Sequence, residues 1–468
     1  MKKVMIIGGG ITGLAAAYYL QKIAKENQLA LDIHLVEAAE ALGGKINTVH
    51  HGEFIMEAGA DSIVARKQNV APLIEELGLQ DEVVYNATGK SFIHADGELK
   101  PIPEETVFGI PLSIESLAKS GLISAEGKVE ALKDFYTANE TFTKNDSIGR
   151  FLTSFLGKEL VEKQIAPVLS GVYSGEIDEL TIASTLPYLL DYKNEYGSII
   201  KGLSENRATF MRPGNKKFLS FKNGMSALVD RFESRLSEVD ITKGVRAEKI
   251  DKSQDRYVVA LSNGERVETD FVVLGTPHSA AQALLRSGEL NEHFDRLKDS
   301  SLISVYLGFD IPDERLPADG TGFIAADSSD LICNACTWTS RKWEHTSKSS
   351  RLLVRLFYKS SKAAFEDLRK RSEEELLKVA LQDVERSLGI AADPLTFIVT
   401  NWYEAMPNYH IRHNEIVQAL EKEMEKHFPH VILAGCSYYG VGIPDCIANG
   451  EKTAKLIAGK LIGSPAGS

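Results

Sequence analysis

The stretch that decides the fold is VMIIGGGITGLAAAYYLQKIAKENQLALDIHLVEAAEALGGK, which runs from Val4 to Lys45. Four apolar residues open it, a Gly8-Gly-Gly-Ile-Thr-Gly13 turn follows at once, and an Ala- and Leu-rich run comes next. This order predicts a buried parallel strand, a tight turn and a helix. A second strand is predicted at residues 33–36.

The spaced glycines and the acid after the second strand predict a dinucleotide site. Gly8 suits the tight turn, Gly10 lets backbone approach a pyrophosphate, and Gly13 lets the helix lie close on the strand. The helix N-terminus offers N–H groups and positive dipole charge to phosphates, and Glu37 stands where a carboxylate can accept ribose hydroxyls. A purely structural turn is the alternative, and the flanking strand, helix and acid favour dinucleotide binding.

A second glycine pair, Gly43 and Gly44, stands with Lys45 soon after the acid. A loop of this kind can approach the same pyrophosphate and offset its charge. With these residues the segment resembles the N-terminal fingerprint of the flavin-containing amine oxidase, protoporphyrinogen oxidase and phytoene desaturase superfamily. The resemblance implies FAD as the cofactor, bound in an extended form by the glycine turn, by Glu37 and by the Gly-Gly-Lys segment.

Composition bounds the kind of protein. The 468 residues are 43% hydrophobic and 25% charged, an ordinary globular profile with length for two or three domains. The net charge is -12 and no run of Lys or Arg is present, so nucleic-acid binding has no electrostatic footprint. No cleavable leader precedes the first strand and no apolar stretch approaches the roughly twenty residues that span a bilayer. We therefore expect a cytoplasmic protein.

The four cysteines, Cys333, Cys336, Cys436 and Cys446, are too few for a disulfide framework. Cys333 and Cys336 have the spacing of a metal or redox motif. They lie in a strand-like segment without His or Cys partners beside them, which predicts two small residues packed in a sheet and no metal site.

Residues near 108–196 have apolar positions at helical spacing and predict a helical insertion. Within it, the run Ser-Gly-Val-Tyr-Ser-Gly at 170–175 is similar to a turn of the bacterial coproporphyrinogen and protoporphyrinogen oxidases. That resemblance implies that Val172 and Tyr173 lie near the substrate. A helix-ending turn capped by glycines is the structural alternative.

Four further segments along the chain carry the resemblance. Residues 59–62 are implied to be flavin neighbours, with a plain turn as the alternative. Val245 is implied to meet the adenine, and Trp402 in a Trp-x-x-x-x-Pro-x-Tyr signature is implied to lie beside the flavin, with a core aromatic as the alternative. A strand, a glycine turn and a helix after residue 430 would aim a second helix N-terminus at the flavin.

The implied cofactor-binding residues are Gly8, Gly10, Ile11, Thr12, Gly13, Glu37, Ala38, Gly43, Gly44, Lys45, Gly59, Ala60, Asp61, Ser62, Val245, Trp402, Gly435, Val441, Gly442 and Ile443. Cys436 departs from the acidic residue that the family commonly has after the glycine, so no cofactor contact is assigned to it. For substrate binding we predict Lys67, Val172 and Tyr173. Lys67 is the candidate partner of a substrate carboxylate, with Arg66 or a merely solvated lysine as alternatives.

The implied fold class is α/β, with a Rossmann-like FAD-binding domain of the flavin amine oxidase and protoporphyrinogen oxidase type, a mixed-sheet substrate domain and a helical domain. The FAD-binding domain is predicted from 1–72, 216–280 and 425–468, the substrate-binding domain from 73–107, 197–215 and 281–424, and the helical domain from 108–196.

The resemblance implies an oxidoreductase of haem biosynthesis. Coproporphyrinogen III, and also protoporphyrinogen IX, would be oxidised to the porphyrin by hydride transfer to FAD, with oxygen as acceptor and hydrogen peroxide as product. No Ser-His-Asp set or carboxylate pair predicts a catalytic side chain, so the chemistry is assigned to the cofactor. Peripheral contact with a membrane and contact with ferrochelatase are compatible with the resemblance, and the sequence tests neither.

Two alternatives stay open. A flavin amine oxidase would share the fingerprint, but it usually has an aromatic pair near the C-terminal glycine turn. Tyr438 and Tyr439 are adjacent and are expected to point apart on a strand, which makes an aromatic cage doubtful. A flavin-binding protein without turnover is the second alternative.

Overall fold

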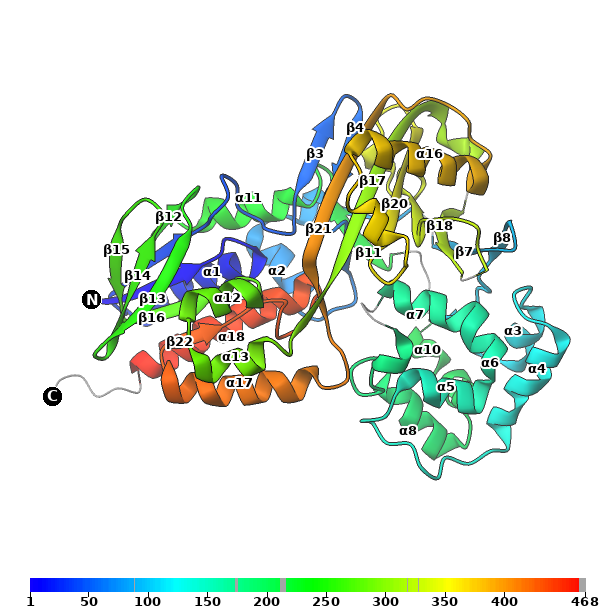
Figure 1. Ribbon diagram of the computed structural model, residues 1–468, viewed down its shortest axis with the longest axis horizontal. Coiled ribbons are helices and arrows are strands. Elements are labelled where there is room, and N and C mark those ends of the chain that lie inside the picture. The colour runs from blue at the N-terminus through cyan, green and yellow to red at the C-terminus, as the bar shows by residue number, and fades with distance from the viewer. Residues whose placement is uncertain (88, 173–175, 211–215, 318, 327, 463–468) are drawn as a thin grey trace.

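The computed structural model describes residues 1–462 except 88, 173–175, 211–215, 318 and 327. Figure 1 shows three groups of elements. A parallel sheet with its helices lies at the end marked N, a sheet with long strands lies above and to the right of it, and a group of helices lies below that second sheet. The long strands β17 (Lys298–Pro312) and β21 (Thr396–Asn408) connect the first two groups.

The apolar run at the start of the chain forms the centre of a five-stranded sheet. Its strand order is β12-β2-β1-β16-β22, and all four neighbouring pairs are parallel. Val4 to Ile7 are buried, as expected for a central strand covered on both faces. The strands are β1 (Lys2–Ile7), β2 (Leu31–Val36), β12 (Val239–Thr242), β16 (Phe271–Leu274) and β22 (Val431–Leu433).

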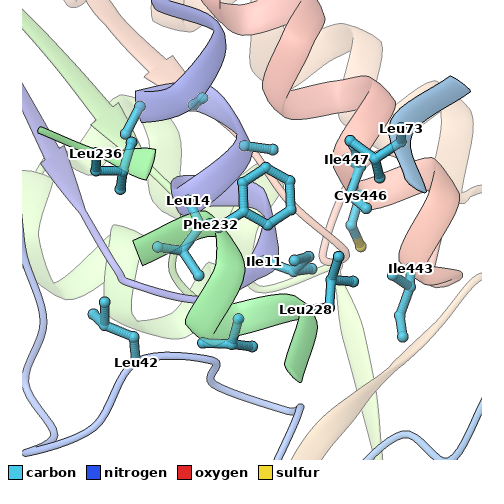
Figure 2. Close-up of a cluster of buried hydrophobic side chains, with 14 of the residues drawn as sticks. Ile11, Leu14, Leu42, Leu73, Leu228, Phe232, Leu236, Ile443, Cys446 and Ile447 are labelled. Atoms are coloured by element: carbon cyan, nitrogen blue, oxygen red, sulfur yellow. The ribbon is translucent and has the colours of Figure 1, made fainter. Parts of the chain in front are cut away.

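One face of this sheet is covered by three helices that belong to distant parts of the chain. Figure 2 shows their shared core, in which Leu14 of the first helix lies near Phe232 and Leu228, and Cys446 and Ile447 come from the last helix. The helices are α1 (Ile11–Glu26), α11 (Ser226–Arg235) and α18 (Ile443–Ile462).

The other face is covered by an antiparallel three-stranded sheet and three helices, which share a second hydrophobic core with the parallel strands. The elements are β13 (Ala247–Ser253), β14 (Arg256–Leu261), β15 (Arg266–Thr269), α12 (His278–Leu285), α13 (Gly288–Phe294) and α17 (His413–His427).

A seven-stranded mixed sheet forms the second group, in the order β21-β17-β20-β19-β18-β7-β8. Only the β18–β7 pair is parallel. Cys333 and Cys336 are buried free thiols in its core, which confirms the prediction that they pack in a sheet. The strands are β7 (Lys90–Ala95), β8 (Glu98–Pro101), β17 (Lys298–Pro312), β18 (Gly320–Ala325), β19 (Ala335–Trp338), β20 (Arg351–Lys359) and β21 (Thr396–Asn408), and its helices are α14 (Thr339–Lys342), α15 (Phe365–Leu368) and α16 (Glu373–Leu388).

The third group is helical and has its own apolar core. Its elements are α3 (Ile114–Lys119), α4 (Ala125–Ala131), α5 (Ile148–Leu156), α6 (Lys158–Leu160), a π-helical stretch (Val161–Ile165), α7 (Ala166–Val172), α8 (Pro187–Tyr196), α9 (Ile199–Glu205) and α10 (Arg207–Phe210). Short elements join the groups: β3 (Thr48–His51), β4 (Phe54–Glu57), β5 (Ile63–Val64), α2 (Val70–Leu77), β6 (Val83–Tyr85), β9 (Thr106–Val107), β10 (Ile110–Pro111) and β11 (Phe218–Phe221).

Two stretches pack differently from the predicted division into domains. Ile199, Ile200 and Leu203 of α9 belong to the core of the helical group, so this helix packs with the helices of residues 148–196. Likewise α13 and α17 pack under the parallel sheet. In both cases the amphipathic face buries its apolar residues against the nearest helices. The remaining domain boundaries stay a prediction.

Among the helices that the structure describes, none combines the length and apolar composition needed to cross a bilayer.

Candidate cofactor site

The first glycine turn leaves room above the start of α1. Gly8 has φ +104°, and a Cβ there would meet the carbonyl oxygen of Gly275 at 2.7 Å. A Cβ on Gly13 would run into the carbonyl oxygen of Gly8. At Gly10, in contrast, a Cβ would meet no atom of the chain within 4 Å, and no side chain caps the helix there. The turn is therefore closed on the protein side and open where a ligand would sit.

The second glycine loop packs directly against the first. The backbone N–H of Gly43 donates to the carbonyl of Gly9 at 2.9 Å, and Gly10 and Gly43 form a parallel bridge. A Cβ on Gly44 would lie 3.3 Å from the Cα of Gly10. The two loops predicted to approach one pyrophosphate are thus adjacent.

Glu37 lies at the carboxyl end of β2, beside both glycine loops. Its Oε2 accepts from the N–H of Gly9 at 2.6 Å and its Oε1 accepts from the N–H of Ala39 at 2.8 Å. The carboxylate is half-buried and retains acceptor capacity for a ribose. The N–H of Val245 donates to the Glu37 carbonyl at 3.1 Å, so the predicted ribose and adenine neighbours are in contact, and Ala38 lies exposed between them and the solvent.

The segment 59–62 lies against the second glycine loop. The N–H of Ala60 donates to the carbonyl of Lys45 at 2.9 Å, and the Ser62 hydroxyl donates to Asp61 at 2.8 Å. Burial alone would raise the pKa of Asp61, but its ion pair with Lys342 at 2.9 Å lowers this pKa to about 2. Asp61 is therefore a carboxylate at neutral pH.

Two side chains of the seven-stranded sheet hold the residues that lead into this segment. The indole N–H of Trp402 on β21 donates to the carbonyl of Ala58 at 3.1 Å. The guanidinium of Arg355 on β20 donates to the carbonyls of Ala58 at 3.2 Å and Gly59 at 3.0 Å. Trp402 was predicted as a site residue, whereas Arg355 was not, because its only signal in the sequence is an arginine inside an apolar strand.

The C-terminal glycine turn closes the site from the last strand. Gly435 follows β22, donates to the side chain of Asn449 at 2.8 Å and lies next to the Thr12 hydroxyl in the first turn of α1, where Thr12 and Ile11 are buried. The Tyr409 hydroxyl donates to the carbonyl of Cys436 at 2.6 Å.

The turn that follows exposes some of its residues. Val441 is 56% exposed and Gly442 is half-buried, whereas Ile443 is buried at the start of α18. Tyr438 and Tyr439 lie in a turn after β22 and not on a strand, and their ring centroids are 5.8 Å apart. The expectation that they point apart on a strand was therefore wrong, because the strand ends at Leu433.

Cys436 contacts the lysine of the second glycine loop, which the sequence did not predict. The Nζ of Lys45 lies 3.4 Å from its sulfur. A hydrogen bond from Cys446 and the charge of Lys45 lower the pKa of the Cys436 thiol. A thiol with a lowered pKa thus lies beside this cation, at the position where the resemblance implies an acidic residue.

The structure gives less support to the predicted substrate-binding residues than to the predicted cofactor-binding residues. The Nζ of Lys67 pairs with Asp445 in the first turn of α18 at 2.8 Å, and both side chains are more than one-third exposed. A substrate carboxylate would have to compete with this ion pair. Val172 ends α7, and Tyr173 lies outside the described residues.

Five groups thus meet at one place: an uncapped helix N-terminus, two glycine loops, a carboxylate and a lysine. An extended nucleotide with a pyrophosphate needs these groups, because its phosphates require N–H donors and positive charge and its ribose requires an acceptor. Within the described residues, no group of three His, Cys, Asp or Glu side chains could hold a metal ion.

Comparisons with known proteins agree with this reading. A family model described as flavin containing amine oxidoreductase matches residues 11–458. A protein named coproporphyrinogen III oxidase from Bacillus subtilis (strain 168) is 36% identical over 96% of both chains, and one of the same name from Staphylococcus aureus (strain NCTC 8325 / PS 47) is 31% identical over 98% of this chain and 100% of the relative. A solved structure described as a putative protoporphyrinogen oxidase from Exiguobacterium sp. 255-15 has a TM-score of 0.89 and 33% identity over 98% of this chain and 99% of that chain.

Proposed function

Because the chain belongs to the family of flavin-containing amine oxidoreductases, we propose that it uses FAD to oxidise coproporphyrinogen III to coproporphyrin III. The observation that carries this choice of substrate is the match to a coproporphyrinogen III oxidase at 36% identity over 96% of each chain. A match that covers the whole length of both proteins includes the substrate sheet and the helical group, and not the nucleotide fold alone.

The proposed reaction removes six hydrogen atoms from the macrocycle, and three equivalents of molecular oxygen accept them as hydrogen peroxide. When bound, FAD supplies the two-electron redox chemistry, and the chain supplies binding and orientation. Glu37, which accepts from Gly9, would hold the ribose end, and the N-terminus of α1 with Lys45 would offset the pyrophosphate charge. Segment 59–62, which Trp402 of β21 adjoins through Ala58, would face the flavin from the side of the seven-stranded sheet.

The assay that tests the function uses the purified yellow protein in air. Coproporphyrinogen III, protoporphyrinogen IX and a panel of amines are supplied separately, and porphyrin fluorescence and peroxide are followed. We expect fluorescence to rise with peroxide, and faster for coproporphyrinogen III. Peroxide from an amine without porphyrin would move the protein to the amine oxidases, and bound FAD without any turnover would support a flavin-binding protein.

Protoporphyrinogen IX is the second candidate substrate, favoured by the 33% identity to the structure described as a putative protoporphyrinogen oxidase. The two substrates differ in their number of carboxylates. The ratio of kcat/KM for the two compounds in the same assay decides between them. Vesicle flotation and co-purification would test the membrane and ferrochelatase contacts that the resemblance allows.

The cofactor site itself is tested at Gly10. Its φ of -68° is accessible to any residue and its Cβ position is empty, so Gly10→Val should leave the fold of the apoprotein intact. The added side chain would occupy the space assigned to the pyrophosphate, and we expect at least a tenfold loss of FAD affinity. The control is Gly121→Val, at an exposed glycine that also has no neighbours within 4 Å. Equal FAD affinity in the two variants would contradict this placement.

A further inference from the structure

Arg355 is a buried cation that was not among the predicted site residues. It lies in the middle of β20 and is 4% exposed. Its guanidinium carbon is 4.7 Å from the ring centroid of Phe357 and 5.1 Å from that of Tyr306. A buried arginine is costly unless its hydrogen bonds and charge serve a purpose, so its partners are informative.

The partners of Arg355 are mainly backbone groups of one distant segment. Its two terminal nitrogens donate to the carbonyls of Gly59 and Ala58, and one of them also contacts the Ser304 hydroxyl at 3.2 Å. Its Nε is buried and has no partner among the described residues. These bonds tie the substrate sheet to the strand end that leads into segment 59–62, which itself packs on the carbonyl of Lys45.

The nearby carboxylates do not fully neutralise the positive charge of Arg355. Asp61 is ionised but is paired with Lys342 at 2.9 Å, which leaves the guanidinium without a dedicated carboxylate. Glu57 is buried nearby, and its burial raises its pKa to about 7, so its negative charge is only partial at neutral pH. An excess of positive charge therefore remains beside segment 59–62.

We propose that Arg355 is a positioning residue for the flavin, which holds segment 58–62 in place through two carbonyls and adds a buried positive charge that raises the reduction potential of the bound cofactor. This inference rests on the proposed function only in that FAD must occupy the site. The two-electron reduced flavin carries negative charge near neutral pH, so a nearby cation stabilises it relative to the oxidised form.

Three variants separate the effect of the hydrogen bonds of Arg355 from the effect of its positive charge. Arg355→Met removes the hydrogen bonds and the charge, and Arg355→Lys keeps the charge but cannot reach both carbonyls with a planar fork. Arg231→Met is the control, because the Nη1 of Arg231 also donates to two successive carbonyls, those of Leu77 at 2.7 Å and Gly78 at 2.9 Å. Arg231 lies on α11, outside the predicted flavin contacts.

The readouts are the FAD dissociation constant, from titration of the flavin-stripped protein, and the flavin reduction potential, from reduction against reference dyes. We expect Arg355→Met to bind FAD about tenfold more weakly and to shift its preference for reduced flavin about tenfold, which lowers the potential by about 30 mV. Arg355→Lys should also bind FAD more weakly but keep nearly the wild-type potential. Arg231→Met should change neither quantity.

An unchanged potential in Arg355→Met, or an equal shift in Arg231→Met, would overturn the electrostatic part of the proposal. If Arg355→Met does not fold, Arg355→Lys decides, because wild-type FAD affinity in that variant would overturn the positioning role. None of these measurements uses a porphyrinogen. The proposed function could therefore fail in the substrate assay while this inference stands, or the reverse.

Discussion

Glu57 shows how strongly the interior acts on a single side chain. It ends β4, is 5% exposed and accepts hydrogen bonds from the N–H of Met225 at 2.8 Å and the hydroxyl of Thr48 at 2.9 Å. These donors favour the carboxylate, but burial outweighs them and raises the pKa from 4.5 to about 7. The folded protein therefore binds a proton here that the unfolded chain has already released.

This shift predicts a pH dependence of stability. Between about pH 4.5 and pH 7 the folded state holds more protons at Glu57 than the unfolded state, so the contribution of Glu57 to the free energy of unfolding should fall as pH rises through this window and level off above it. The loss is at most about 3 kcal/mol, because each pKa unit is worth ~1.4 kcal/mol.

Glu57→Gln removes the titration, so the variant should gain stability relative to the wild type as pH rises from 4.5 to 7. Denaturant unfolding at several pH values measures the difference. The control is Glu98→Gln at an exposed position in β8, which should give a pH profile parallel to that of the wild type. A constant difference between wild type and Glu57→Gln over this range would refute the prediction.

Among the elements, the contact between α1 and α18 depends on one small residue. A Cβ on Gly450 would lie 2.6 Å from the carbonyl oxygen of Thr12 and 2.8 Å from the Cβ of Ala15. The N-terminus of α1 is the part of the helix that faces the cofactor site. The close packing of the last helix therefore supports the position of the first.

Gly450→Val should push the two helices apart and destabilise the protein by about 1–3 kcal/mol, the usual cost of overpacking. FAD affinity should fall as well. Gly459→Ala, in the same helix but with no neighbour within 4 Å, should instead stabilise by about 0.5–1 kcal/mol. Thermal unfolding of both variants tests the pair, and equal destabilisation would show that the contact with α1 is not the cause.

The helical group has a buried ion pair at its centre. The side chains of Lys193 and Asp134 are fully buried and 3.0 Å apart, and Asp134 also accepts from the N–H groups of Ile199 and Ile200 at the start of α9. Removal of the carboxylate would leave a buried ammonium without its counter-charge and three donors, the N–H groups of Ile199 and Ile200 and the Ser198 hydroxyl, without this partner. Such losses are far larger than those of exposed pairs.

Asp134→Ala should therefore destabilise the helical group by about 3–5 kcal/mol. The matched exposed pair is Lys144 and Asp191, also 3.0 Å apart, and Asp191→Ala should cost less than about 1 kcal/mol. Hydrogen exchange of α8 and α9 reports this local stability. Similar exchange rates in the two variants would contradict the prediction that the buried ion pair contributes more stability than the exposed one.

At the scale of the whole molecule, the structural elements that could be predicted from the sequence are those marked by a local sequence pattern. The apolar run Val4 to Ile7, the glycine turn and Glu37 lie within one unit of strand, turn and helix, and the structure has this unit at its centre. The bonds of Arg355 to Ala58 and Gly59 join residues almost 300 positions apart, and no local pattern records them. The packing of α9 with other helices was missed for the same reason, because an amphipathic helix does not specify its partner.

Since the candidate cofactor site brings together residues that are distant in the sequence, from the start of α1 to Gly435 after β22, bound FAD should link the parts of the nucleotide-binding half of the molecule. Flavin removal should therefore lower the melting temperature, and added FAD should restore it in a concentration-dependent way. At 100 times the dissociation constant the expected gain is about 2.7 kcal/mol. FMN lacks the adenosine half that would reach Glu37 and Val245, and should restore less.

Binding of FAD across these segments also predicts which backbone amides should exchange more slowly with solvent. Slower exchange on FAD addition is expected at the start of α1, at residues 43–45 and at residues 58–62, since these share hydrogen bonds around one site. The buried pair of Lys193 and Asp134 lies in a separate core, so α8 and α9 should not respond. Uniform protection over both regions would mean that FAD stabilises the molecule globally, and the site would then be more rigidly coupled to the helical group than the separate cores suggest.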